Sequence, residues 1–481
     1  MPAARTTTLI PMPARRHRDL VRTGDRAEAD SAAPARCGPA DSGSAGWDVP
    51  GSAQPRVIGR CLTSRGDVVR TGLLDIGPLR TSPEFRRLWS GTVAIRFSGQ
   101  MAVVAVLYQV WELTRSPLWT GAIGVATAVP TIVLGLVGGT IADTFDRRRV
   151  VLLTSVGAVV AAALLAAQAV AGLESAALVL ALVAAQTSCT ALGFASRRAF
   201  IPRLLPRPQV AAGVALEILA FQVAMLVGPA VAGVVLARWG LGWAYAVDAL
   251  AILLSLYGVA RLPSMRPEGG TPRAGLRATG EGLAFLWRRP ALRGVLATDL
   301  AATVLAIPVA LFPAINQERF GGDPHTLGLL LTAVAVGGIA SGLLSGAVTS
   351  AARPGAVMLG SVGVWGLALA GFGLVDGLAA TLTCLAIAGA ADSVSVISGG
   401  TLVQLETPDG FRGRINSAQY AVGAGGPGLG DARAGLVAGL ASASAAAVSG
   451  GLACVLAVAV IAGTHPALRR WRRRDPDDDE A

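Results

Sequence analysis

The stretch GGTIADTFDRRRVV, from Gly138 to Val151, joins two long apolar runs and carries acids followed by a cluster of arginines. Gly138 and Gly139 have no side chains and therefore allow helices to approach closely. Asp143 is expected at a helix N-terminus, where a negative charge is favoured by roughly 0.3–1 kcal/mol. The arginines that follow are expected to anchor the turn at the inner membrane surface and to pair with acids. Alone, the stretch is also compatible with an ordinary positively charged turn.

The composition favours an integral membrane protein. Of the 481 residues, 53% are hydrophobic and only 15% are charged, whereas a soluble domain carries about 25% charged residues. This excludes a disordered chain, a collagen and a small disulfide scaffold, and argues against a large soluble enzyme. The net charge is +11 and all 41 basic residues are arginine. A basic balance can indicate nucleic acid, but the apolar majority favours a membrane.

Metal and disulfide chemistry have no support in the sequence. The five cysteines are widely scattered without a C-x-x-C pair, and the three histidines, His17, His325 and His465, are far apart. No metal site and no bound cofactor are therefore predicted.

From Leu88 onward, apolar runs of about 20 residues, long enough to cross a bilayer, alternate with short polar breaks. Twelve spans are predicted, and the Gly-rich run near 415–438 is the most polar of them. The predicted spans are 88–111, 118–141, 150–172, 176–196, 210–237, 242–260, 292–315, 326–349, 355–375, 378–402, 415–438 and 444–464.

The arginine distribution sets the orientation. Every segment that the alternation places inside carries at least one arginine, whereas the outer segments carry only Arg115, Arg238 and Arg319. Arginine-rich loops stay cytoplasmic. Both termini are therefore predicted inside, in a multi-pass protein of the inner (cytoplasmic) membrane, and the basic balance no longer calls for a nucleic-acid partner.

The chain is expected to be all-α, with two pseudo-symmetric bundles of six helices each. Residues 1–78 form an Arg- and Pro-rich extension, expected to be disordered or to reflect a start set too far upstream. The bundles comprise 79–260 and 291–464. Residues 261–290 form a cytoplasmic linker with an amphipathic helix, and 465–481 a charged tail.

The spacing of Gly139, Asp143 and Arg147 to Arg149, placed between the second and third spans, resembles the cytoplasmic signature of the major facilitator superfamily. The acid Asp146 before the arginines is similar to the branch of bacterial efflux proteins that contains the enterobactin exporter. LRTSPEFRRLWSG (79–91), TPDGFRGRIN (407–416) and GDARAG (430–435) are also similar to that branch.

This resemblance implies a secondary active transporter and no enzyme. The expected function is proton-coupled export of a small metabolite such as a siderophore, by alternating access, in a monomer driven by the proton motive force. Multidrug or macrolide-type antibiotic efflux is the alternative, followed by a membrane sensor or subunit without transport.

The glycine–proline motif of drug/proton antiporters is only partly present: Gly228 and Pro229 remain, and Pro229 predicts a helix kink. The predicted fourth span, 176–196, lacks those antiporters' arginine.

Ionisable residues inside spans are costly and are therefore functional candidates. We expect Arg96, Asp299 and Asp392 to form a titratable cluster in the central cavity, with Gln100 on the same helix face as Arg96. Protonation of an acid would weaken its pairing with Arg96 and shift the balance between inward and outward states. A purely structural pairing of these charges is the alternative. The weaker candidates are Glu217, Asp248, Asp431 and Arg433.

Overall fold

The computed structural model describes residues 75–265, 284–285, 287–306, 308–343, 346, 348, 350–407 and 412–472. The chain divides into Met1–Arg70, which lies outside the described residues, and Thr71–Ala481. Most of the predicted amphipathic helix of the linker, most of the N-terminal extension and the last residues of the tail also lie outside them. The helices are α1 (Gly77–Thr81), α2 (Pro83–Thr114), α3 (Pro117–Thr144), α4 (Arg147–Val170), α5 (Ala176–Arg198), α6 (Ile201–Leu204), α7 (Arg207–Trp239), α8 (Leu241–Ala260), α10 (Pro290–Leu300), the π-helix η1 (Ala301–Leu305), the 3-10 helix η2 (Val309–Leu311), α11 (Phe312–Phe320), α12 (Pro324–Leu343), α14 (Pro354–Leu374), α15 (Leu378–Glu406), α16 (Arg412–Leu440), α17 (Ala443–Thr464) and α18 (Pro466–Arg469).

The helices begin where the sequence supplies a capping side chain. The hydroxyls of Ser82, Ser175 and Ser442 accept hydrogen bonds from backbone N–H groups in the first turns of α2, α5 and α17. Several helices also have proline at a first position, where no N–H needs an intrahelical partner. These signals set the helix starts that follow the short polar breaks.

Eleven described helical segments are long and apolar enough to cross a membrane. The predicted eleventh span is a continuous helix, α16, but its Gly-rich and polar sequence keeps it out of that set. The number twelve therefore stays a prediction, as does the cytoplasmic position of the termini. Exposed aliphatic residues follow helical spacing, as expected for faces in contact with lipid, on α4 at Leu153, Val156, Val160 and Leu164.

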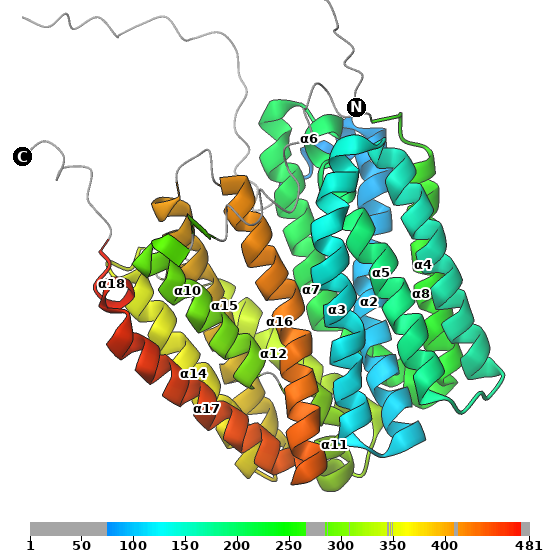
Figure 1. Cartoon of the computed structure of the whole chain (residues 1–481). Coiled ribbons are helices and arrows are strands. Elements are labelled where there is room, and N and C mark those ends of the chain that lie inside the picture. Colours follow the sequence, from blue (N-terminus) through cyan, green and yellow to red (C-terminus); the bar gives the residue numbers. More distant parts are fainter. Residues whose placement is uncertain are drawn as a thin grey trace, which may run out of the picture. The chain divides into compact units, whose positions relative to one another are not determined.

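The two halves repeat the same helix pairings. In the first half α3 packs against α5, and α4 packs against both α5 and α8. In the second half the corresponding helices do the same: α12 packs against α15, and α14 against both α15 and α17. The contacts between the halves are also reciprocal, because α3 packs on α16 and α7 on α12. Figure 1 shows α3 and α16 side by side.

Glycines mediate the contacts between the halves. A Cβ on Gly121 of α3 would lie 2.8 Å from Cα of Gly435 in α16, and Gly124 faces Gly428 in the same way. At the other contact, Gly233 of α7 faces His325 of α12. These contacts all lie towards the ends that the arginine distribution predicts to be outside, here called the outer ends. Among the described residues, the two halves therefore meet closely at their outer ends.

The seventh span departs from the prediction of one continuous helix over 292–315. It consists of α10, the π-helix η1, the 3-10 helix η2 and α11. Pro308, just before η2, explains the interruption, since proline lacks an N–H and its ring clashes with the preceding turn. The apolar run alone gave no sign of the break because Ala, Val and Leu continue on both sides of it.

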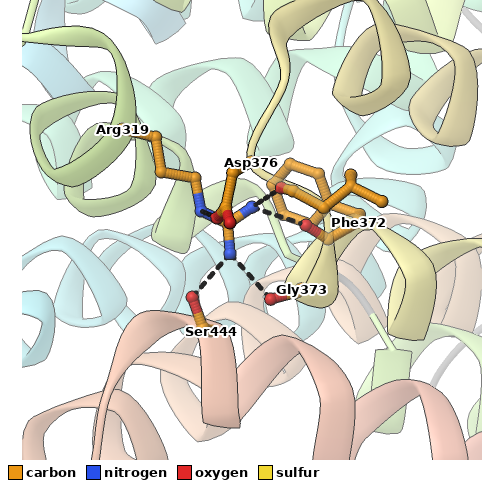
Figure 2. Close-up of polar contacts among 6 residues, drawn as sticks. Arg319, Phe372, Gly373, Asp376 and Ser444 are labelled. Atoms are coloured by element: carbon orange, nitrogen blue, oxygen red, sulfur yellow. Dashed lines mark hydrogen bonds and ion pairs between the residues drawn. The ribbon is translucent and has the colours of Figure 1, made fainter.

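Arg319 fixes the outer end of α11 against two other helices (Figure 2). Its guanidinium donates to the backbone oxygens of Phe372 at 2.9 Å and Gly373 at 2.7 Å, and to that of Val375. It also donates to Oγ of Ser444 at 2.7 Å. The side chain is only 9% exposed. Arg319 therefore satisfies carbonyls that the C-terminus of α14 leaves unpaired and links α11 to α14 and α17.

Replacing Arg319 with alanine should lower the free energy of unfolding by about 2–3 kcal/mol, because charge-assisted hydrogen bonds to buried carbonyls are lost. Thermal unfolding in detergent would show a lower midpoint. Arg238→Ala, which removes an exposed arginine at another outer end, is the control and should leave the midpoint unchanged. Equal midpoints for the two variants would contradict this role.

Candidate functional site

The signature loop connects α3 to α4 and is fixed to the start of the linker. α3 continues to Thr144, so Asp143 lies in the last turn of a helix and not at the N-terminus predicted for it. The side chain of Asp143 and the surroundings of Gly139 lie outside the described part. Asp146 takes the capping position: its Oδ1 accepts hydrogen bonds from the N–H groups of Arg148 at 2.9 Å and Arg149 at 3.4 Å.

The Asp146 carboxylate also accepts a hydrogen bond from the backbone of the segment that follows α8. The N–H of Met265 donates to Oδ1 of Asp146 at 3.3 Å, and the N–H of Arg147 donates to the Met265 oxygen at 3.1 Å. The Arg148 guanidinium donates to the oxygen of Ala260 at 2.7 Å. Burial alone would raise the pKa of Asp146, but the three N–H donors and the charge of Arg149 bring that pKa below its ordinary value.

An arginine–glutamate cluster, consisting of Arg96, Arg197 and Glu217, occupies the first half. The Glu217 carboxylate of α7 lies within electrostatic reach of both arginines. Arg96 of α2 also lies over the ring of Phe221, with Cζ 5.2 Å from its centroid. Two cations and one acid leave the cluster with a surplus positive charge.

Arg197 is the member of this cluster that sequence reasoning missed. The sequence suggests a cytoplasmic loop residue after span 176–196, but α5 continues to Arg198. The Arg197 guanidinium donates to Oγ of Ser255 at 2.9 Å and to Oγ of Ser155 at 3.2 Å. It thus reaches from the end of the fourth span to the third and sixth. The sequence places this arginine directly after an apolar run, and nothing in that pattern shows that its side chain points back towards the neighbouring spans.

Asp299 and Asp392 form an acid pair in the second half. Asp299 is within electrostatic reach of Asp392. Asp392 is exposed and Asp299 is half-buried. Ionisable side chains inside spans are functional candidates. The structure brings these two predicted residues together and places the third, Arg96, in the arginine–glutamate cluster.

Asp299 also lies directly before the interruption of the seventh span. It is the second-last residue of α10, and Oγ1 of Thr303 in η1 donates to the Asp299 carbonyl oxygen at 2.7 Å. π-Helical turns inside α-helices are frequent at functional sites. The acid pair is therefore next to the least regular part of any described span.

Asp248 of α8 is buried, at 3% exposure, and neutral donors satisfy it. Oγ of Ser98 donates to its Oδ1 and Nε2 of Gln186 to its Oδ2, both at 2.7 Å. A neighbouring amide network joins Gln109 and Gln168, and Tyr245 donates to Oε1 of Gln109 at 2.7 Å. Sequence reasoning missed this network, although glutamines in apolar runs are a visible signal.

The remaining candidates have packing roles or lie at the seventh span. A Cβ on Gly228 would lie 2.6 Å from Cβ of Gln100, so this pair allows α7 to approach α2 closely. Pro229 lies inside the continuous helix α7. Asp431 and Arg433 of α16 point to different partners: Asp431 accepts from the N–H of Ala310, and Arg433 lies against α17.

Replacing Asp146 with alanine should destabilise the protein by about 0.5–2 kcal/mol, because a cap of α4 is lost. Asp146→Asn retains the acceptor oxygen and should lose less. Because folding lowers the pKa of Asp146, its charge adds stability above the unfolded value near 3.9, and this is lost as the pH falls through the folded value. Unfolding midpoints of the alanine variant and the wild type, measured in detergent, should therefore converge at acidic pH. A constant difference from pH 7 down to the lowest measurable pH would contradict this assignment.

Residues 75–480 match the family described as transmembrane secretion effector. The chain is 27% identical to the enterobactin exporter EntS of Shigella boydii serotype 18 over 405 residues, which cover 84% of this chain and 97% of the exporter.

Two solved structures resemble the fold at low identity. The nucleoside transporter NupG has a TM-score of 0.61 at 14% identity and covers 81% of this chain and 100% of its own. A bacterial homologue of the iron transporter ferroportin in an inward-facing state has a TM-score of 0.60 at 15% identity, covering 81% and 99%. With the repeated helix pairings and the signature loop, these matches lead to one conclusion. The chain is a multi-pass membrane transporter that belongs to the transmembrane secretion effector family of the major facilitator superfamily.

Proposed function

We propose that the protein is a proton-coupled exporter of a small metabolite such as a siderophore, and that it works by alternating access. The observation that carries the coupling is the acid pair, Asp299 and Asp392. Two carboxylates within electrostatic reach repel each other, and one bound proton removes that repulsion. The similarity to an enterobactin exporter supports the direction of transport and the class of substrate.

The closed outer side supports the mechanism. The halves are in contact through glycines at the outer ends, and this supports a state of the alternating-access cycle in which access is from the cytoplasm. In this state an anionic metabolite would meet the surplus positive charge of the arginine–glutamate cluster. Return of a proton to the acid pair from the outer side would then follow the outward release of the metabolite. The two events use different halves of the molecule.

Asp299→Asn should abolish gradient-driven transport, because an amide cannot exchange a proton with the solvent. The assay is accumulation of iron-free enterobactin in everted membrane vesicles with an acidic interior, with and without an uncoupler. Asp392→Asn should give the same loss. Glu174→Gln, which alters an exposed acid at an outer loop, is the control and should transport as the wild type does.

Full gradient-driven accumulation by Asp299→Asn would remove the acid pair from the mechanism. If the wild type accumulates no enterobactin but does accumulate a macrolide antibiotic, the siderophore assignment is wrong and the antibiotic alternative takes its place.

A further inference from the structure

The interruption of the seventh span leaves backbone groups without intrahelical partners inside the membrane. α10 continues directly into η1 and η2 directly into α11, so the interruption itself lies between the end of η1 and the start of η2, beside Pro308. Within a bilayer such groups need partners from the protein, because no lipid atom can supply a hydrogen bond. One such partner comes from the neighbouring helix α16.

α16 presents an acid to one side of the break. Oδ1 of Asp431 accepts a hydrogen bond from the N–H of Ala310 in η2 at 2.8 Å. A carboxylate is the favourable group at this position because the starts of helices carry partial positive charge. Asp431 therefore holds the beginning of the outer part of span 7 against α16.

Arg433 occupies the other side. A Cβ on Gly450 of α17 would lie 2.6 Å from the Leu305 oxygen, and the Arg433 guanidinium closes on the same Gly450 position. Leu305 is the last residue of η1, where unpaired carbonyls carry partial negative charge. α16 thus places an acid on one side of the interruption and an arginine near the other.

Asp431 also lies beneath the contact between the two halves. A Cβ on Gly124 of α3 would lie 2.8 Å from Cβ of Asp431. The same glycine faces Gly428, one turn earlier in α16, and α3 also contacts η2. One side chain therefore touches the first half, the second half and the interrupted span.

We propose that Asp431 is a positioning residue for the closed outer side. By holding Ala310 against α16, it keeps η2 and α11 where α3 can pack against them, and it thereby favours the inward-open state. This inference rests on the proposed alternating access, but its test measures conformation and needs no substrate. Among substitutions, asparagine retains an acceptor for the Ala310 N–H, whereas alanine leaves that N–H without one.

The test compares distances between spin labels at Glu174 and Ala379, exposed residues at the outer ends of the two halves. The five native cysteines are first replaced by serine or alanine. The wild type should show mainly short distances in detergent or nanodiscs. Asp431→Ala should raise the ratio of open to closed protein by roughly tenfold, as expected for the loss of one hydrogen bond to a charged group. Asp431→Asn should stay close to the wild type.

Glu318→Ala is the matched control, since it removes an exposed acid from α11 away from the junction. Its distances should equal those of the wild type. Gly124→Val supplies a second variant in case Asp431→Ala does not fold: it pushes a side chain into the same junction from α3 and should also open the outer side. If Asp431→Ala is monodisperse and keeps the wild-type distances, the proposal is wrong. If it does not fold, wild-type distances in Gly124→Val overturn it equally.

Transport is then measured separately in everted vesicles. An open outer side in Asp431→Ala together with a wild type that exports no siderophore would refute the proposed substrate and leave the role of Asp431 standing. Wild-type distances together with active siderophore export would refute only the role of Asp431.

Discussion

Every backbone N–H and C=O inside a bilayer needs a partner from the protein, and this requirement shapes the second half of the molecule. In the first six spans, continuous helices pair these groups with one another. The seventh span is interrupted, and there a side chain supplies a partner: Asp431 accepts a hydrogen bond from the N–H of Ala310. Arg319 does the same at the end of α14, where it donates to backbone carbonyls. The charged residues of these spans are therefore partly explained by backbone satisfaction before any transport role is considered.

Charge is distributed unequally between the two halves, although their helix pairings match. The first half holds the arginine–glutamate cluster with its surplus positive charge, while the second holds the acid pair. The helix pairings are the same in the two halves, whereas the charged side chains are different. Such a division suits a transporter that handles two different species, because each half then offers its own kind of binding group.

Much of the fold follows from the sequence, and the reasons are physical. Apolar runs of membrane length locate the spans, and serine or proline at their starts sets where helices such as α2 and α5 begin. The interruption of the seventh span was not predictable from hydropathy, because Pro308 lies in a run that remains apolar on both sides. The prediction that Asp143 lies at the start of a helix was wrong, because α3 continues to Thr144 and the turn begins only at Phe145.

The site was predictable only in part. Membrane burial drew attention to Asp299, Asp392 and Asp431, because ionisable residues are rare in spans. Their partners depend on which helix faces are adjacent, and a single sequence does not contain that information. Arg197 is the clearest example. Its position in the sequence predicts a loop residue, but its guanidinium donates hydrogen bonds to serines on two other spans.

The glycine contacts between the halves have a consequence for the motion itself. Where backbone meets backbone, as at Gly121 with Gly435, there are no rotamers to exchange when one helix rolls over another. Interlocked large side chains would have to unlock together and would resist such rolling. A contact between glycines presents little barrier to this rolling. It also gives little preference for one angle between the two helices. In the proposed alternating access, the populations of the two states would then depend on a few polar contacts at the outer ends, and single substitutions there would shift the balance.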